Sequence, residues 1–451
     1  MPDSTAGGGM HPLDRALGEM HEHLWDESRG MVRLYGLHLV RETALGAFLD
    51  LEHGRIDRAV RAIRNVLALQ YSNDVDPRWA GTFKVHASQP DAGTLDDDGR
   101  PRDRRWVDFD PNWRQFLGMI LWVTDHVHGA ALPDDLRVDV RRAIAFAVTG
   151  ETETRIPPSY TNIALLHSWL CSVAGDGSTT NLAAAVAERI RRDGDIVEYN
   201  SPTYDAISLL AACLMIDHSP DPRLNELGEL VVTCVCNRLG VVWHPGLGVQ
   251  AGPYSRAYGL DPRLYVALNS VLMTAIDVAA AGPTRLDNTT THVHDLYFLP
   301  IFRRLCGRLR NRLLTRDVGE SRRHVQRFDG VVATSIVEPD MVVGWEHGRR
   351  SRFALDQYTP FAMFAKDGFI GVRTRPDTEW VDVHEVAPHV YELRCSRLAD
   401  HPASGDVASL TIVASRAPVT HENEMIFGRV TLQFPGIAVQ VRLAGRGRKP
   451  S

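Results

Sequence analysis

Apolar residues recur at helical spacing almost without interruption from about Pro12 to about Leu313. Side chains three and four positions apart share one face of a helix, so this pattern predicts a series of amphipathic helices. Glycines follow several of the predicted helix ends, as expected for C-caps. The pattern predicts helices over residues 12–27, 31–53, 56–70, 112–128, 133–148, 160–174, 179–193, 203–217, 222–240, 261–281 and 295–314.

Short and long connections alternate between these helices. Tight turns such as residues 52–54 and 175–179 join two helices into a hairpin, whereas longer segments join one hairpin to the next. Units that repeat at roughly 40 to 50 residues in this way are typical of stacked helical hairpins. Closed into a ring, they form an incomplete (α/α)5–6 toroid with every long loop at one end. An open solenoid is the alternative, but its loops would line an extended surface.

The pattern changes at Phe328, where short runs of alternating apolar and polar residues begin. Such runs predict strands. They cover residues 330–336, 341–345, 369–373, 390–394, 409–413, 428–434 and 437–443. The predicted fold is therefore α+β and mainly α, with an antiparallel β-sandwich after the helical toroid.

The same change divides the chain into segments. We predict a disordered N-terminus over residues 1–11 and an α/α toroid catalytic domain over 12–315. An Arg-rich linker over 316–327 leads to an antiparallel β-sheet domain over 328–445, and a basic tail over 446–451 ends the chain.

Composition narrows the function classes. The 451 residues are enough for two or three domains with full cores. A formal net charge of -6 argues against nucleic acid as the main partner, since nucleic-acid binders usually present a basic surface. No apolar run reaches the roughly 18 residues of a membrane span. The N-terminus shows no signal-peptide pattern, and no cysteines form a CxxC pair, so we expect a cytoplasmic protein with reduced thiols and no membrane partner.

The long loops carry more reactive side chains than simple connections do. The segment Glu198-Tyr-Asn-Ser-Pro-Thr-Tyr204 places two phenols, a carboxylate and an amide directly before a helix. Such groups on loops fixed by rigid elements are more often functional than structural. Aromatic walls with amides and a guanidinium suit a sugar ring, and in uronates also its carboxylate. If the hairpins close into a ring, the long loops meet at one mouth.

Three motifs resemble a known group of enzymes. They are Tyr160-Thr-Asn-Ile163, Glu198-Tyr-Asn-Ser-Pro-Thr-Tyr204 and Gly252-Pro-Tyr-Ser-Arg-Ala-Tyr-Gly259. With a toroid followed by an antiparallel β domain, the chain is similar to the heparinase II/III-like and alginate-lyase-like polysaccharide lyases. The resemblance implies β-elimination from a uronate-containing oligo- or polysaccharide. The chain departs from some of these lyases by having Ile163 after Asn162, where they have a His, and by lacking a visible signal peptide.

The resemblance also assigns roles. Elimination removes a weakly acidic proton α to a carboxylate, so the developing charge must be neutralised, a base must take the proton and an acid must protonate the leaving oxygen. Asn162 corresponds to the neutralising residue and Tyr204 to the catalytic Tyr, which serves as acid and in some members as base. Arg256 is the cation that would orient the carboxylate or lower a phenol pKa. Tyr258 is an alternative acid and His244 an alternative base. The expected substrate-binding residues are Asn112, Trp113, His167, Glu198, Asn200 and Tyr254.

Other functions stay open. A glycoside hydrolase on the same toroid needs two carboxylates across a cleft. Asp108 or Asp110 would pair with Glu198, and Asp261 is a further choice. A uronate epimerase would share the proton abstraction, and a cytoplasmic enzyme of secondary metabolism would reuse the fold for a small molecule. A non-catalytic carbohydrate-binding protein is the remaining class.

The elimination chemistry requires no cofactor. The segments His292-Val-His294-Asp295 and His21-Glu-His23 each place ligand-type residues close together, but neither has a known metal-binding framework. Alternate residues on a helix do not share a face. We therefore predict no metal among the site residues and leave open a structural divalent ion. The expected partner is an acidic carbohydrate, and a homo-oligomer is compatible with the sequence.

Overall fold

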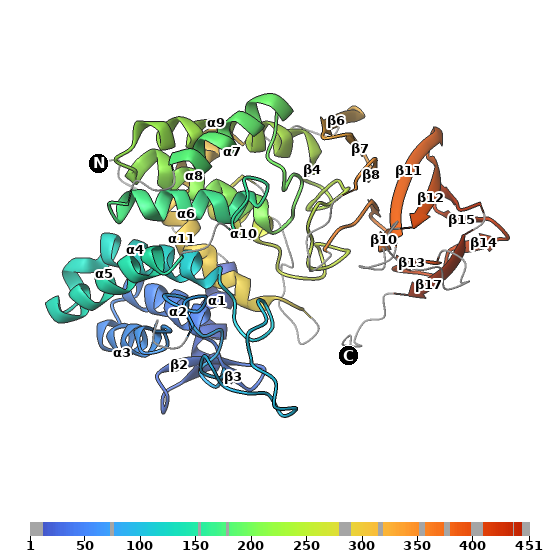
Figure 1. The fold of residues 1–451 in the computed structure, drawn as a ribbon. Helices are drawn as coiled ribbons and strands as arrows, with labels where there is room; N and C mark the ends of the chain where they lie inside the picture. Colours follow the sequence, from blue (N-terminus) through green and yellow to red (C-terminus); the bar gives the residue numbers. More distant parts are fainter. Residues whose placement is uncertain are drawn as a thin grey trace.

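The computed structural model of this chain has the predicted α+β composition, with helices on one side and the C-terminal strands on the other (Figure 1). It describes residues 12–72, 76–151, 155–176, 180–278, 290–313, 319–350, 357–373, 379–397, 409–435 and 437–443. The predicted disordered N-terminus (1–11) and basic tail (446–451) lie outside the described residues.

Four helix pairs, each joined by a short connection, form most of the helical region after α1 (Pro12–Leu24). They are α2 (Val40–Glu52) with α3 (Ile56–Leu67), α4 (Trp113–His128) with α5 (Asp134–Thr149), α6 (Thr161–Val173) with α7 (Thr180–Asp193), and α8 (Tyr204–His218) with α9 (Pro222–Val242).

Burial separates the first helix of a pair from the second. Helix α3 buries only Ala59, Ala62, Ile63 and Val66, which are spaced three and four apart, so one face packs inward and the other meets solvent. Helix α8 is buried without a break from Tyr204 to Met215. A helix that is apolar on all sides must be surrounded by other elements. The first helices are therefore the inner ones.

The inner helices pack in an order that returns to its start. Helix α2 packs against α4, α4 against α6, and α6 against α8. Helix α8 then packs against α10 (Leu268–Ala275), α10 against α11 (Leu299–Leu305), and α11 against both α8 and α2. This order places the starts of α4, α6 and α8, with the loops that feed them, on neighbouring helices.

Three predicted helices are shorter or interrupted. In the predicted helix 31–53, β2 (Met31–Leu34) and β3 (Leu37–His38) form a hairpin that also pairs with β1 (Trp25–Asp26). The turn residues Tyr35 and Gly36 both have positive φ, 53° and 80°, as a two-residue hairpin turn requires. Apolar periodicity does not reveal such a turn.

The last two predicted helices are also shorter in the structure than predicted. The prediction over 261–281 reduces to α10, although residues 279–281 lie outside the described ranges. The prediction over 295–314 divides into η2 (Val293–Phe298), α11 and η3 (Gly307–Asn311). A proline at the start of α11 separates it from η2, because proline cannot donate the hydrogen bond of a continuing helix.

The C-terminal strands form two sheets. The larger has the order β17-β13-β10-β9-β8-β7-β6, and the smaller has the order β11-β12-β16-β15-β14. The strands are β6 (Arg322–Phe328), β7 (Val331–Glu338), β8 (Met341–His347), β9 (Phe361–Ala365), β10 (Gly368–Arg373), β11 (Glu379–Ala387), β12 (Val390–Arg397), β13 (Ser409–Ala414), β14 (Val419–His421), β15 (Glu424–Phe427), β16 (Val430–Gln433) and β17 (Ala438–Leu443). Each predicted strand coincides with one of these.

Two expectations about this region are wrong. The sheets are mixed rather than antiparallel, because β13 pairs with β17 and β12 with β16 in parallel. The predicted linker 316–327 overlaps β6, which pairs along its whole length with β7. The arginines make this strand read as a polar linker in the sequence. In the structure the Arg323 guanidinium lies over the Trp345 ring, 5.1 Å from its centre, and donates to Glu385.

Both sheets contribute side chains to one hydrophobic cluster. Val343 and Phe361 of the larger sheet pack there with Tyr391 and Leu393 of the smaller sheet. The opposite side of the larger sheet joins the helical core, which includes Val342 and Phe364. Alternate residues of β8 thus face different cores, as the two-residue period of a strand requires.

Backbone contacts fix the loop between α9 and α10 to the larger sheet. Tyr254 and Thr359 exchange two backbone hydrogen bonds of 3.1 and 3.0 Å. Ser335 Oγ donates to Gly252 O over 2.6 Å. A Cβ at Gly344 would lie 1.7 Å from Gly252 O, so only glycine permits this approach. The sheet therefore sets the position of this loop.

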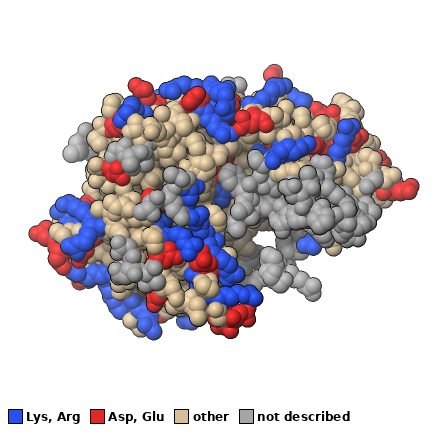
Figure 2. Space-filling view, in the orientation of Figure 1, with Lys and Arg blue, Asp and Glu red and all other residues tan. Residues whose placement is uncertain are grey.

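Charged residues of both signs are interspersed over the visible face (Figure 2). Within the described ranges, no helix has both the length and the apolar character needed to cross a lipid bilayer.

We expect Arg238→Gln to destabilise the protein strongly. Arg238 on α9 donates to Asp195 over 2.5 Å and to both oxygens of Asp205 at the start of α8 over 2.8 and 3.0 Å, and all three side chains are buried. Its loss would leave two buried carboxylates without their cation, which costs roughly 3–5 kcal/mol. Urea denaturation measures the change in the free energy of unfolding.

Arg223→Gln is the matched control. Arg223 pairs with Asp221 over 2.8 Å, but its side chain is 64% exposed. Loss of an exposed pair should cost no more than about 1 kcal/mol. Equal effects of the two substitutions would contradict the role given to Arg238.

Candidate functional site

Side chains from four loops meet where α4, α6 and α8 begin. Asn112 Nδ2 of the first loop donates to the Tyr160 hydroxyl of the second over 2.8 Å. Glu198 of the third loop contacts Asn162 at the start of α6 and Arg256 of the fourth loop. These contacts join residues that are up to 144 positions apart in sequence, from Asn112 to Arg256.

Glu198 is the centre of this network. Its Oε2 accepts hydrogen bonds from the Asn162 backbone N–H over 2.8 Å and from Asn162 Nδ2 over 2.6 Å. Its Oε1 accepts one from Arg256 Nη1 over 2.6 Å. The carboxylate thus meets the positive end of the α6 dipole as well as a guanidinium. Because Glu198 is 0% exposed, it positions its neighbours and does not contact a ligand in this arrangement.

Arg256 carries this positioning to a pair of tyrosines. Its Nη2 donates to the Tyr204 hydroxyl over 3.1 Å, and its guanidinium carbon lies 3.9 Å from the centre of the Tyr204 ring. The hydroxyls of Tyr204 and Tyr258 lie 2.9 Å apart. Tyr204 is 8% exposed and Tyr258 is partly exposed, so the pair lies at the edge of the core.

Burial controls the protonation of this pair. It raises the pKa of Tyr204, and the positive charge of Arg256 only partly opposes that effect. Burial likewise raises the pKa of Tyr258 well above its usual value, and the neighbouring Tyr204 adds to the shift. Both phenols are therefore protonated at neutral pH and can donate protons.

A second group of polar side chains lies before α4. Trp113 Nε1 donates to Asp110 over 3.1 Å, and burial raises the pKa of the Asp110 carboxyl. Arg155 Nη1 donates to Asn112 Oδ1 over 2.7 Å. Trp113 and Asn112 are thus fixed beside Tyr160, whose ring lies 5.4 Å from the Arg256 guanidinium.

His292 and Arg41 lie near the tyrosine pair on the side of Tyr258. The Tyr258 ring stacks on His292, with centroids 4.5 Å apart and an interplanar angle of 7°. Arg41 lies 5.8 Å from the Trp113 ring and bonds to Glu42 and Asp295 over 2.6 and 3.3 Å. Its described hydrogen bonds use Nε and Nη2.

A protein-family comparison matches residues 9–306 to a family described as a domain of unknown function (DUF8769). This chain belongs to that family. No curated protein matches it at a significant level. The residues of the network all lie inside the DUF8769 region, whereas the larger sheet that anchors the fourth loop lies outside it.

The DUF8769 region brings together seven of the predicted site residues, in two roles. Tyr204 is buried, with 8% of its surface exposed, whereas Tyr258 is partly exposed and is the more accessible of the two to a ligand. Trp113 lies at the edge of the core. The remaining members of the network position these three: Asn112, Asn162, Glu198 and Arg256.

Asn162 does not have the surroundings of a substrate-neutralising residue. It is fully buried, and its amide N–H group bonds to Glu198. Arg256 is 5% exposed and uses its donors on Glu198, Tyr204 and Gln357. The predicted contact of either residue with a substrate carboxylate therefore has no support in this arrangement.

Three other predicted residues hold the framework instead. Asn200 has a positive φ of 55°, and its Nδ2 donates to Ala251 O and Pro253 O over 2.7 Å each. The hydroxyl of Tyr254 donates to Gln250 O over 2.7 Å, and its side chain is fully buried. His244 accepts a hydrogen bond from Leu247 N within its own turn.

His167 lies on the buried face of α6. Its Nδ1 is 3.3 Å from Gln115 Nε2. Burial lowers the pKa of His167 to about 4, so it is neutral at physiological pH. These contacts explain it as a core histidine.

The structure adds four features to the site residues predicted for a lyase: Arg41, Asp110, Tyr160 and the His292 group. Of these, Tyr160 had the clearest sequence signal, because it opens the motif Tyr160-Thr-Asn-Ile163. Arg41 gave no signal, because it lay inside a predicted helix far from the other loops. Three surface hollows among the described residues, one of them lined by Arg64, Gln70 and Asp139, share no residue with this site.

We expect stability to fall at alkaline pH in a way that depends on the tyrosine pair. The folded pKa values of Tyr204 and Tyr258 are raised above the ordinary value of 10.0. The unfolded chain therefore releases these protons first, so the stabilisation is complete below about pH 10 and is lost as pH rises through the folded pKa values. Each phenol contributes a slope of up to about 1.4 kcal/mol per pH unit.

Urea denaturation between about pH 8 and pH 11 measures this slope. Other buried tyrosines contribute to it, so the comparison is between wild type and the Tyr204→Phe/Tyr258→Phe double variant. The double variant should show a shallower slope. An unchanged slope would contradict the shifted pKa values.

Proposed function

We propose that this protein is a lyase that cleaves an acidic saccharide by β-elimination, with Tyr204 and Tyr258 as the proton-transfer pair. The observation that carries this proposal is the 2.9 Å contact between the phenols of Tyr204 and Tyr258 at the edge of the core, the first of which is held by Arg256. Elimination needs a base and an acid close together. Two adjacent hydroxyls provide both.

The proposed elimination takes one proton from the substrate and returns one to the leaving oxygen. One phenol, as phenolate, takes the proton α to the substrate carboxylate, and the electrons of that C–H bond form the new C=C bond. The bond from the β carbon to the glycosidic oxygen breaks, and its electron pair leaves on the oxygen. The second phenol protonates this oxygen. Proton transfer between the two hydroxyls then restores the starting pair.

Arg256 contributes by its charge on Tyr204. A guanidinium 3.9 Å from the ring stabilises the phenolate relative to the phenol, against the effect of burial. It acts through Tyr204, so we assign it and Glu198 as positioning residues. This differs from direct neutralisation of the substrate by Asn162 or Arg256.

Several features favour an anionic substrate. The N-termini of α4, α6 and α8 are at this site, and each presents the positive end of a helix dipole. Arg41 is the cation best placed to meet a carboxylate, since its side chain is 15% exposed and Nη1 is outside its described hydrogen bonds. Trp113 next to it offers an apolar face for a sugar ring.

We infer that the helical region is an incomplete (α/α) toroid. The packing order that leads from α2 through α4, α6, α8, α10 and α11 back to α2 supports this inference. The hydrophobic cluster shared by the two sheets supports a β-sandwich beside it. Both would agree with the resemblance to the heparinase II/III-like lyases.

A glycoside hydrolase is the less favoured function. It needs two carboxylates that can exchange protons with substrate. Both oxygens of buried Glu198 already accept hydrogen bonds, and Asp108 and Asp261 pair with Arg104 and Arg263. Only Asp110, whose pKa is raised by burial, has the character of a catalytic acid.

The direct test is incubation with uronate-containing glycans while ultraviolet absorbance of the unsaturated product is followed. A lyase produces this absorbance, whereas a hydrolase releases reducing ends without it. Absence of absorbance with every acidic glycan, from neutral to alkaline pH, would contradict the proposal. Because one phenol must ionise, kcat/KM should rise with pH toward the alkaline range.

Tyr204→Phe should lower kcat by about 10²- to 10⁴-fold, the usual contribution of a general acid or base. The control is Tyr71→Phe, which removes a buried hydroxyl that donates to Pro90 O and belongs to a separate aromatic cluster. Its activity should equal that of wild type. Comparable losses in both variants would indicate a structural effect instead of catalysis.

A further inference from the structure

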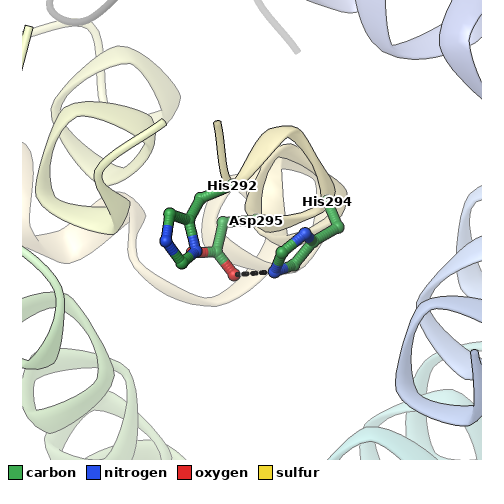
Figure 3. A group of neighbouring side chains, drawn as sticks. All are labelled: His292, His294 and Asp295. Carbon is green, nitrogen blue, oxygen red and sulfur yellow. Dashed lines mark ion pairs between the residues drawn. The ribbon is translucent and has the colours of Figure 1, made fainter. Parts of the chain in front are cut away.

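Three ligand-type side chains converge at the start of η2. His292, His294 and Asp295 each place one donor atom within 4.8 Å of the other two (Figure 3). The sequence pattern predicts no metal among the site residues, because alternate residues on a helix face apart, and leaves open a structural divalent ion. That reasoning fails because His292 precedes the helix in a left-handed conformation, with φ of 54°.

Each of these side chains also has a buried polar atom without a hydrogen-bond partner among the described residues. The atoms are His292 Nδ1, His294 Nδ1 and Asp295 Oδ2. Asp295 is only 2% exposed. Buried polar atoms are normally paired, so three unsatisfied atoms in one small cluster indicate a missing partner that can accept several ligands.

We propose that His292, His294 and Asp295 bind a divalent first-row transition metal ion, with zinc as the best match. Two imidazoles and one carboxylate favour zinc, iron or nickel over magnesium and calcium, which prefer oxygen ligands alone. Three protein ligands leave a coordination position open for an oxygen of water or of a bound molecule.

The spacing fits such an ion after a small adjustment. Ligand atoms of a tetrahedral zinc ion lie about 3.4 Å apart at the usual bond lengths of about 2.1 Å. His294 Nε2 lies 3.8 Å from Asp295 Oδ1, close to that value. The three donor atoms all lie within 4.8 Å of one another, so a small inward turn of the side chains would bring them to this spacing.

Neighbouring charges are compatible with a cation. Arg41 contacts Asp295 Oδ1 over 3.3 Å, but its shorter bond of 2.6 Å is to Glu42. Arg41, Glu42 and Asp295 together carry a net charge of -1, so the cluster attracts a divalent ion, and Asp295 Oδ2 is available to it.

This site would lie beside the proposed proton-transfer pair, since the His292 ring stacks on Tyr258. The metal proposal does not depend on the lyase proposal. Metal binding is measured without substrate, so each can fail while the other holds.

The test uses the full chain purified without a polyhistidine tag. After dialysis against zinc and then metal-free buffer, elemental analysis should find one equivalent of zinc per chain, and competition with a chromophoric chelator gives Kd. His294→Gln and Asp295→Asn should each weaken zinc binding by at least about tenfold. Cobalt in place of zinc should give visible absorption that reports its coordination number and disappears in both variants.

Histidines elsewhere supply the control. His126 and His218 are a close pair, 4.6 Å between ring centroids, without a third ligand-type residue grouped with them in the described chain. His126→Gln/His218→Gln should retain zinc as wild type does. Circular dichroism confirms that each variant is folded. Wild-type protein that retains no zinc, cobalt, iron or nickel would overturn the proposal, as would folded His294→Gln and Asp295→Asn variants that bind zinc with wild-type affinity.

Discussion

The buried ion pair between Glu198 and Arg256 is the interaction on which the rest of the site depends. Its intrinsic contribution to stability is small, because the cost of burying two charges offsets most of their attraction. Its importance is positional. One carboxylate fixes the start of α6 through Asn162 and the fourth loop through Arg256, and the same guanidinium then holds Tyr204. Loss of either partner would leave an uncompensated buried charge.

Two parts of the fold hold this ion pair. The packed inner helices fix Glu198, Asn162 and Tyr204, whereas the larger sheet fixes the loop that carries Arg256. Asn200 adds a direct link, because its side chain bonds to two carbonyls of that loop. The β domain therefore has a structural role in the site although none of its residues belongs to the tyrosine pair.

The network also separates residues that position from residues that can meet a ligand. Fully buried Glu198 accepts hydrogen bonds at both carboxylate oxygens, and the buried Asn162 amide donates to it, while Asn162 Oδ1 has no partner among the described residues. Tyr204, Tyr258 and Arg41 lie at the edge, where hydrophobic surroundings raise phenol pKa values and strengthen electrostatic interactions. This division of roles is the basis of the proposal that the site takes an anionic ligand with an apolar ring face.

The sequence by itself determined the helical pairs, seven of the C-terminal strands and the reactive loops, because periodicity and turn residues are local properties. It indicated Tyr204, Arg256 and Tyr258 for the same reason: polar and aromatic residues were concentrated where simple connections would suffice. It could not reveal the tight turn at Tyr35, or the arginine-rich strand β6.

Only the tertiary structure decided which polar side chains bond within the protein and which are left to meet a ligand. Asn162 and Asn200 read alike in sequence, yet one bonds to Glu198 and the other to backbone carbonyls. Likewise His292 joins His294 and Asp295 only because one left-handed residue redirects its side chain. Such outcomes depend on contacts between segments far apart in the chain, which no local pattern encodes.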